Sequence, residues 1–152
     1  GGDRPEAAHR ALANASELSW SPGDAARVAL WVGDAPPHPG DIGPAMAASE
    51  LLRARGVAVY PVAASGVDPA AEFVMRASAL LSGAEYVFLT DDSGVGDPHA
   101  EPHIPCYEVE KLARVLLRAV WTEVAGRRSE AGEDAIERRV GQSVAGVCQQ
   151  TG

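Results

Sequence analysis

Long apolar runs are missing from the sequence. No stretch approaches the roughly 20 consecutive apolar residues that a membrane-spanning helix needs, so a span is excluded. A secretory signal peptide and an initiator Met are missing as well, and the chain opens abruptly at Gly1-Gly2-Asp3. We therefore expect a piece of a longer protein, for which a missing export signal says nothing about location.

Basic residues are few relative to acidic ones. The sequence contains 13 Lys and Arg against 21 Asp and Glu, which gives a formal net charge of −8 and a pI near 4.9. An acidic surface repels phosphate groups, so nucleic acid and anionic membranes are poor expected partners. Cations are the natural counter-species of such a chain.

The motifs of common enzyme sites are missing too. Ser65 follows a predicted strand but lacks the glycines of a Gly-x-Ser-x-Gly elbow, and no Gly-x-Gly-x-x-Gly follows a strand. His99 and His103 have a spacing that binds zinc on a helix, but the surrounding prolines favour a solvated loop. His9 is predicted to lie on an exposed helical surface. We expect no enzyme, and a hydrolase or a flavodoxin-like enzyme is the weaker alternative.

Three short apolar runs are present within a chain of 152 residues, of which 46% are hydrophobic, enough for one domain with a packed core. The runs are Arg27–Gly33, residues 57–62 and residues 85–90. Continuous apolar runs of this length are typical of strands buried on both faces. Because helical segments separate them, the sequence predicts parallel pairing with right-handed crossovers.

Helical periodicity fills the intervals between these runs. The predicted helices start at Pro5, cover residues 44–55, run from the N-cap Asp68 to Gly83, cover residues 107–124 and, weakly, residues 134–140. Phe73, Ala77 and Leu80 are expected on the apolar side of the third helix. The apolar stripe of the fourth is predicted to be Leu112, Val115, Leu116, Ala119 and Val120.

Three segments together resemble a known family. They are residues 1–6 (Gly-Gly-Asp-Arg-Pro-Glu), residues 32–38 (Val-Gly-Asp-Ala-Pro-Pro-His) and residues 56–62 (Gly-Val-Ala-Val-Tyr-Pro-Val), the last followed by Gly83 and residues 86–91. In this order the chain resembles the C-terminal part of von Willebrand factor type A (vWA) domains over residues 1–125. Residues 126–152 are then an extension with a weak helix and a tail. The resemblance implies a doubly wound, Rossmann-like parallel sheet.

The family also implies a metal-ion-dependent adhesion site where the parallel strands end. Such a site binds a divalent cation, usually Mg²⁺, from three loops, and Asp3 and Asp34 match the second and third loops. A partner's acidic side chain completes the coordination shell, so the resemblance implies a protein-binding module. An alternative is a vWA-like scaffold that has a degenerate metal site and acts in an assembly.

The first loop of the family, Asp-x-Ser-x-Ser, has no counterpart in the sequence. Two carboxylates should hold Mg²⁺ poorly, so we expect the complete domain to bind the ion and this chain to bind it weakly or not at all. Asp91-Asp92-Ser93 half matches the motif. It is either the metal loop of a permuted chain or, the interpretation we favour, a polar loop far from the ion.

Cys106 and Cys148 are the two cysteines. They are either unrelated buried thiols or a disulfide that ties the tail to the last long helix, stable only in an oxidising compartment. Since the family is common in secreted and cell-surface proteins, we expect an extracytoplasmic location. Without the strand that the family places beside it, the strand Arg27–Gly33 becomes an apolar edge that favours self-association.

Overall fold

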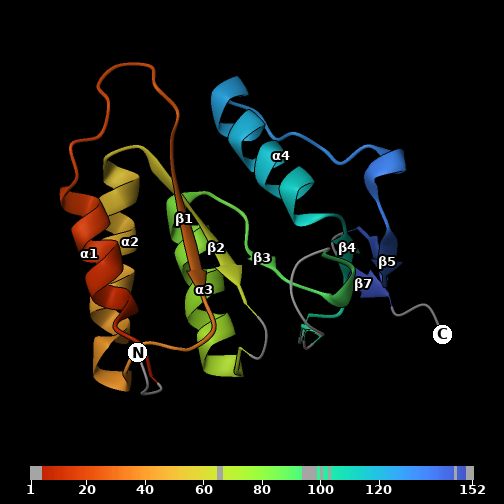
Figure 1. Ribbon diagram of the computed structural model, residues 1–152, viewed down its shortest axis with the longest axis horizontal. Helices are drawn as coiled ribbons and strands as arrows, with labels where there is room; N and C mark the ends of the chain where they lie inside the picture. The colour runs from red at the N-terminus through yellow and green to blue at the C-terminus, as the bar shows by residue number, and fades with distance from the viewer. Residues whose placement is uncertain are drawn as a thin grey trace.

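The computed structural model describes residues 5–64, 67–93, 99, 101–102, 104–145 and 147–149. Within them the chain is a mixed α/β protein with a three-stranded parallel sheet and four α-helices (Figure 1). The helices are α1 (Ala8–Glu17), α2 (Ile42–Ala54), α3 (Pro69–Ser82) and α4 (Leu112–Ala125). None of the helices in this part of the chain has the length and apolarity to cross a membrane.

The parallel sheet has the order β1 (Arg27–Gly33), β2 (Val57–Ala63), β3 (Val87–Phe88). β1 and β2 pair along their full length, from Arg27 opposite Val57 to Gly33 opposite Ala63. All seven residues of β2 are buried, as its continuous apolar run predicts. β3 is shorter than predicted, because only Val87 and Phe88 pair with β2.

Local signals set most helix boundaries. The carboxylate of Asp68 accepts a hydrogen bond from the backbone N–H of Ala71 at 2.8 Å, as expected of an N-cap. Gly83 ends α3 with φ of 78°, a left-handed conformation that favours glycine. The first helix begins later than predicted, at Ala8, because Glu6 instead pairs with Pro37 in a parallel bridge.

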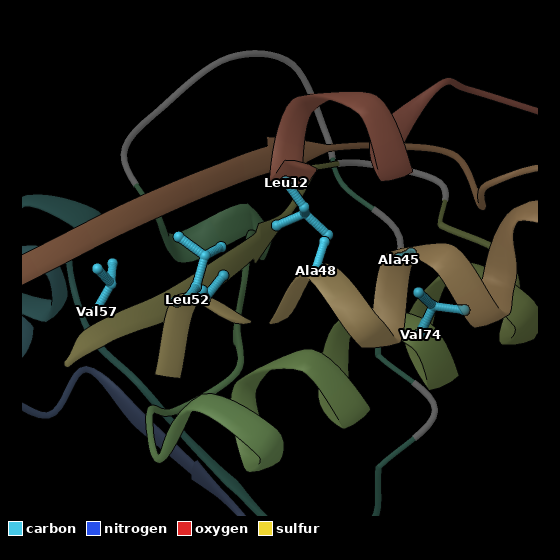
Figure 2. Packing of buried hydrophobic residues seen from close by; sticks show 7 residues of the cluster. Leu12, Ala45, Ala48, Leu52, Val57 and Val74 are labelled. Carbon is cyan, nitrogen blue, oxygen red and sulfur yellow. The ribbon is translucent and has the colours of Figure 1, made fainter. Parts of the chain in front are cut away.

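One face of the sheet is covered by α1, α2 and α3 (Figure 1). Figure 2 shows the core beneath them, in which side chains of the three helices meet the strand β2. The buried members of this cluster are Leu12, Ala45, Ala48, Leu52, Val57, Val59 and Val74. Trp31 of β1 packs against it from the sheet edge.

The buried side of α3 differs from the prediction. Phe73 and Leu80 are 66% and 80% exposed, whereas Val74 is fully buried. Two serines share the buried side: Ser78 bonds Ser49 of α2 at 3.0 Å, and Ser82 bonds the backbone of Val59. These hydroxyls form their hydrogen bonds within the core. The buried side of α3 therefore includes polar residues, and a search for an apolar stripe in the sequence does not identify it.

On the opposite face of the sheet, the described part of the chain places the helix α4. Ala58 and Tyr60 of β2 pack against Ala119 of α4, with Val28 at the margin. Of the stripe predicted for this helix, Ala119 is buried, Leu112, Val115 and Leu116 are half-buried, and Val120 is 44% exposed. Helices therefore lie on both faces of the sheet, but unequally.

Two of the helices predicted in the C-terminal region are wrong in part. Residues 107–109 form the strand β4 (Tyr107–Val109), and the helix begins only at Leu112. Part of the weak helix predicted at 134–140 is the strand β5 (Arg138–Val140), which pairs antiparallel with β4. A hairpin of β6 (Gln142–Val144) and β7 (Val147–Gln149) follows. Short 3₁₀ turns complete the described elements at Pro39–Asp41, Asp91–Ser93 and Glu133–Ala135.

Candidate functional site

The carboxyl ends of the three parallel strands form one rim of the sheet, which is where open α/β sheets bind ligands. Asp34 follows the last residue of β1 directly and is exposed. Its loop is level with the end of β2, because the N–H of Ala64 donates to the carbonyl of Gly33 at 2.8 Å. The structure therefore places the predicted ligand Asp34 at the rim that the sequence implies.

A contact between distant segments extends this rim. Glu6 and Pro37 form a parallel bridge, in which the N–H of Glu6 donates to the carbonyl of Pro36 at 2.8 Å. Glu6 is three residues after Asp3, and Pro37 is three residues after Asp34. Asp3 itself lies outside the described residues. The segment that follows it, however, runs parallel to the loop that Asp34 begins.

The other end of the same loop lies against the first turn of α1. His9, in the first turn of α1, lies with its Nδ1 3.3 Å from the Asp41 carboxylate, which directly precedes α2. The His9 side chain is only 20% exposed, so the prediction of an exposed surface histidine is wrong. Because Asp41 is 32 positions from His9 in the chain, no local sequence pattern predicts this contact. The loop from Asp34 to Asp41 thus pairs with Glu6 before α1 and lies close to His9 in its first turn.

The fit of this rim to Mg²⁺ is partial. Mg²⁺ prefers six oxygen ligands in octahedral geometry and gives up water reluctantly. Asp34 offers one carboxylate, and over the described parts of the chain no group of three or more His, Cys, Asp or Glu side chains is placed to hold a metal. The described residues therefore supply only part of a coordination shell.

The second candidate loop, Asp91–Ser93, is a 3₁₀ turn whose polar groups are used within the fold. The Asp91 carboxylate accepts from the N–H of His99 at 2.5 Å, and the Asp92 carboxylate lies 3.2 Å from Arg138. These contacts favour a structural polar loop over a metal loop. His103, the second histidine of the zinc spacing, lies outside the described residues.

A cavity of about 1050 Å³ lies among β3, β4, α4 and the C-terminal strands. At this cavity the guanidinium of Arg118 in α4 pairs with two carboxylates, that of the buried Glu110 at 2.5 Å and that of Glu85 at 3.7 Å. Arg128 binds Glu85 from the other side at 2.9 Å. No sequence pattern predicts this network, because its partners are brought together by tertiary packing and form no motif. Arg118 and Glu110 lie inside the fold, whereas Arg128 and Glu85 are 65% and 42% exposed at its surface.

Cys106 lines this cavity and is bonded to Cys148. Cys106 and Cys148 form a disulfide with their Cα atoms 5.8 Å apart. Gly141 lies against the bond with φ of 66°, and a Cβ there would come within 2.5 Å of the Pro105 carbonyl. Only glycine therefore allows the backbone to pass so close to the disulfide. The bond ties the β6–β7 hairpin to the chain just before β4.

Comparison with protein-family models, with characterised proteins and with solved structures gave no significant match.

Proposed function

We propose that this chain is the C-terminal part of a vWA-type domain and that it contributes to a protein-binding site in which a divalent cation is shared with an acidic partner group. The observation that supports this most is the Glu6–Pro37 bridge. It lies on the segments that begin at Asp3 and Asp34 and run along the carboxyl end of a parallel sheet. In this proposal the carboxylates of Asp3 and Asp34 form part of one cation cradle.

The chemistry needs no acid, base or nucleophile. A hard cation such as Mg²⁺ binds carboxylate oxygens and keeps open positions that water occupies. An Asp or Glu side chain of the partner replaces one of these waters and completes the shell. Asp34 is suited to this task, because it is exposed at the end of a strand that pairs with β2 along its whole length, and its loop is anchored through Pro37.

Two further observations fit a module of this kind outside the cytoplasm. The net charge of −8 favours cations near the surface. A disulfide between Cys106 and Cys148 persists only where the surroundings are oxidising. We therefore propose a secreted or cell-surface location.

Paramagnetic Mn²⁺ tests the site even where binding is weak. We expect Mn²⁺ to broaden the backbone amide signals of Glu6 and Ala35 more than that of Ala26, which precedes β1 at the opposite end of the sheet. Asp34→Asn should abolish this selective broadening. Asp24→Asn is the matched control, since Asp24 is an exposed carboxylate near the amino end of β1, and it should change nothing.

Two outcomes would contradict the proposal. Broadening centred on Asp91 and Asp92 would move the cation to the loop after β3, and broadening that survives Asp34→Asn would assign it to other groups. Calorimetric titration sets the strength: with so few ligands, Mg²⁺ should bind this chain with millimolar or weaker affinity. Micromolar binding would show that the ligand set is larger than we propose.

The second candidate function is a vWA-like scaffold that acts through its surface in an assembly. It is favoured by exposed apolar side chains on α4, among them Leu117, Trp121 and Val124, which are 56–60% exposed. The same Mn²⁺ experiment separates the two candidates, because a scaffold with a degenerate site predicts no selective broadening at either loop.

A further inference from the structure

β1 is an edge strand: among the described residues only β2 pairs with it. The carbonyl of Gly33 accepts a bond on the β2 side, from Ala64. Backbone groups alternate in direction along a strand, so the odd-numbered residues of β1 bond toward β2. The N–H and C=O groups of Val28, Leu30 and Val32 therefore point to the open edge.

The side chains of these same three residues lie on the α4 face of the sheet. Val28 packs against the cluster of Ala58, Tyr60 and Ala119. Leu30 is 47% exposed and Val32 is 66% exposed, although both follow it on the same face. An apolar strand with an open edge is a template for pairing with another strand.

We propose that β1 pairs antiparallel with β1 of a second copy of this chain, about a two-fold axis at Leu30. A hydrogen-bonded pair in an antiparallel ladder needs two residues that both direct their backbone groups to the shared edge. Only even-numbered residues of β1 do so, which restricts the register to a few choices. Among these, only Leu30 opposite Leu30 pairs all seven residues from Arg27 to Gly33.

The strand is self-complementary in this register. Val28 of one copy lies opposite Val32 of the other, and the two Leu30 side chains lie opposite each other. These β-branched and aliphatic cross-strand pairs cover the side chains that a single copy leaves exposed. A contact in which the same patch serves both copies is the isologous contact of a two-fold dimer, and it closes without propagating into a filament.

Charge selects the antiparallel arrangement over a parallel one. Antiparallel pairing sets Arg27 opposite Gly33 of the second copy, so the end of the strand that carries Arg27 lies beside the end that is followed by Asp34, and symmetry repeats this at the other end. Arg27 keeps its bonds to the carbonyls of Ser21 and Gly23, so the unlike charges act at a distance. Parallel pairing would bring Arg27 beside Arg27 and Asp34 beside Asp34. Like charges at neighbouring cross-strand positions are destabilising. This inference concerns the chain of residues 1–152 and does not depend on the proposed cation site; a strand of a complete domain that paired with β1 would take the place of the second copy.

Sedimentation equilibrium of the whole chain tests the dimer. We expect a mass of twice 15.8 kDa at micromolar concentrations. Leu30→Lys and Val32→Lys should each raise the dissociation constant at least tenfold, because they place a charge in the paired strands. Leu80→Lys is the control, since Leu80 is 80% exposed on α3 and lies away from β1.

Circular dichroism checks that each variant keeps its fold. A chain that stays monomeric at hundreds of micromolar overturns the proposal. So does a native dimer that Leu80→Lys dissociates as strongly as Leu30→Lys, because the interface would then lie on α3.

Cysteine cross-linking tests the register. Two residues of a hydrogen-bonded antiparallel pair have Cα atoms about 5.5 Å apart, which suits a disulfide. Leu30→Cys should therefore cross-link to itself under mild oxidation. Val28→Cys and Val32→Cys should form a mixed dimer when combined and little dimer when alone. Efficient cross-linking of Val32→Cys to itself would overturn the proposed register.

Discussion

The two faces of the parallel sheet are covered very differently. Counted over the described residues, seven buried side chains form one cluster under α1, α2 and α3, with Leu52 and Val59 wholly inaccessible. Over the same residues, the cluster under α4 has three buried members. The same strand shows the contrast: Trp31 of β1 packs against the first cluster, whereas its neighbours Leu30 and Val32, on the other face, stay largely exposed.

Polar contacts and a covalent bond partly replace packing on the α4 side. The Tyr60 hydroxyl donates to the Glu123 carboxylate at 2.7 Å, and Arg118 of α4 binds the buried Glu110. The disulfide then closes the region beyond β3. The difference teaches that hydrophobic burial is concentrated on one face, while the other face is held by specific links and leaves apolar side chains exposed.

The largest expected effect comes from the packed face. Leu52→Ala removes a wholly buried side chain and leaves a cavity, so the free energy of unfolding should fall by about 4 kcal/mol. Leu117→Ala is the matched change on the outer side of α4, where 58% of the side chain is exposed, and should cost less than about 0.5 kcal/mol. Urea unfolding measures both. Losses of similar size would show that the outer side of α4 is covered in solution.

Removal of the disulfide should have the next largest effect. The bond closes a segment of 42 residues, and in the chain-entropy description the loss of that constraint lowers the free energy of unfolding by about 3–4 kcal/mol. Replacing Cys106 and Cys148 together by Ser should show this in urea. Reductant should destabilise the native chain and leave the double variant unchanged. An unchanged unfolding midpoint in the double variant would mean that the bond contributes little.

A smaller effect is expected where a single hydrogen bond joins α4 to the sheet. Tyr60→Phe removes the donor to Glu123 and should lower the free energy of unfolding by about 1 kcal/mol. Tyr86→Phe is the control, because within the described part of the chain the buried Tyr86 hydroxyl has no hydrogen-bond partner. That control should be close to neutral, and an equal loss in both variants would remove the role given to Glu123.

The sequence predicts the elements whose signals are local. β1 and β2 are continuous apolar runs, and β2 is buried along its whole length, whereas β1 keeps exposed residues on one face. Asp68 and Gly83 mark the ends of α3 by their own backbone chemistry. The rim position of Asp34 follows from the end of β1 in the same way. These features need no knowledge of distant residues.

The features that the sequence does not predict depend on distant partners. The polar side chain of Ser78 suggests an exposed position, but its hydroxyl is hydrogen-bonded to Ser49 across the interface between α2 and α3, so the residue is buried. Residues 107–109 form a strand only because Arg138–Val140, about thirty positions later, pairs with them. The bridge of Glu6 to Pro37 joins two short segments without any periodicity. In each case tertiary context overrides a weak local preference.

The smallest expected effect concerns Tyr107 of β4, which lines the cavity beside α4, and it is tested through pH. Burial, followed by the hydrogen bond to Glu101, raises the pKa of Tyr107 to about 12, whereas an unfolded chain has a tyrosine pKa near 10. The folded state holds this proton more tightly, so the contribution is fully present below pH about 10 and is lost as pH rises towards about 12. Tyr107→Phe should therefore lose less stability than the native chain across this alkaline interval. Urea unfolding at several pH values, with the ultraviolet absorbance of tyrosinate, measures the difference. Identical pH slopes for the two chains would show that Tyr107 titrates as a solvated phenol, and that the strand β4 does not shield it.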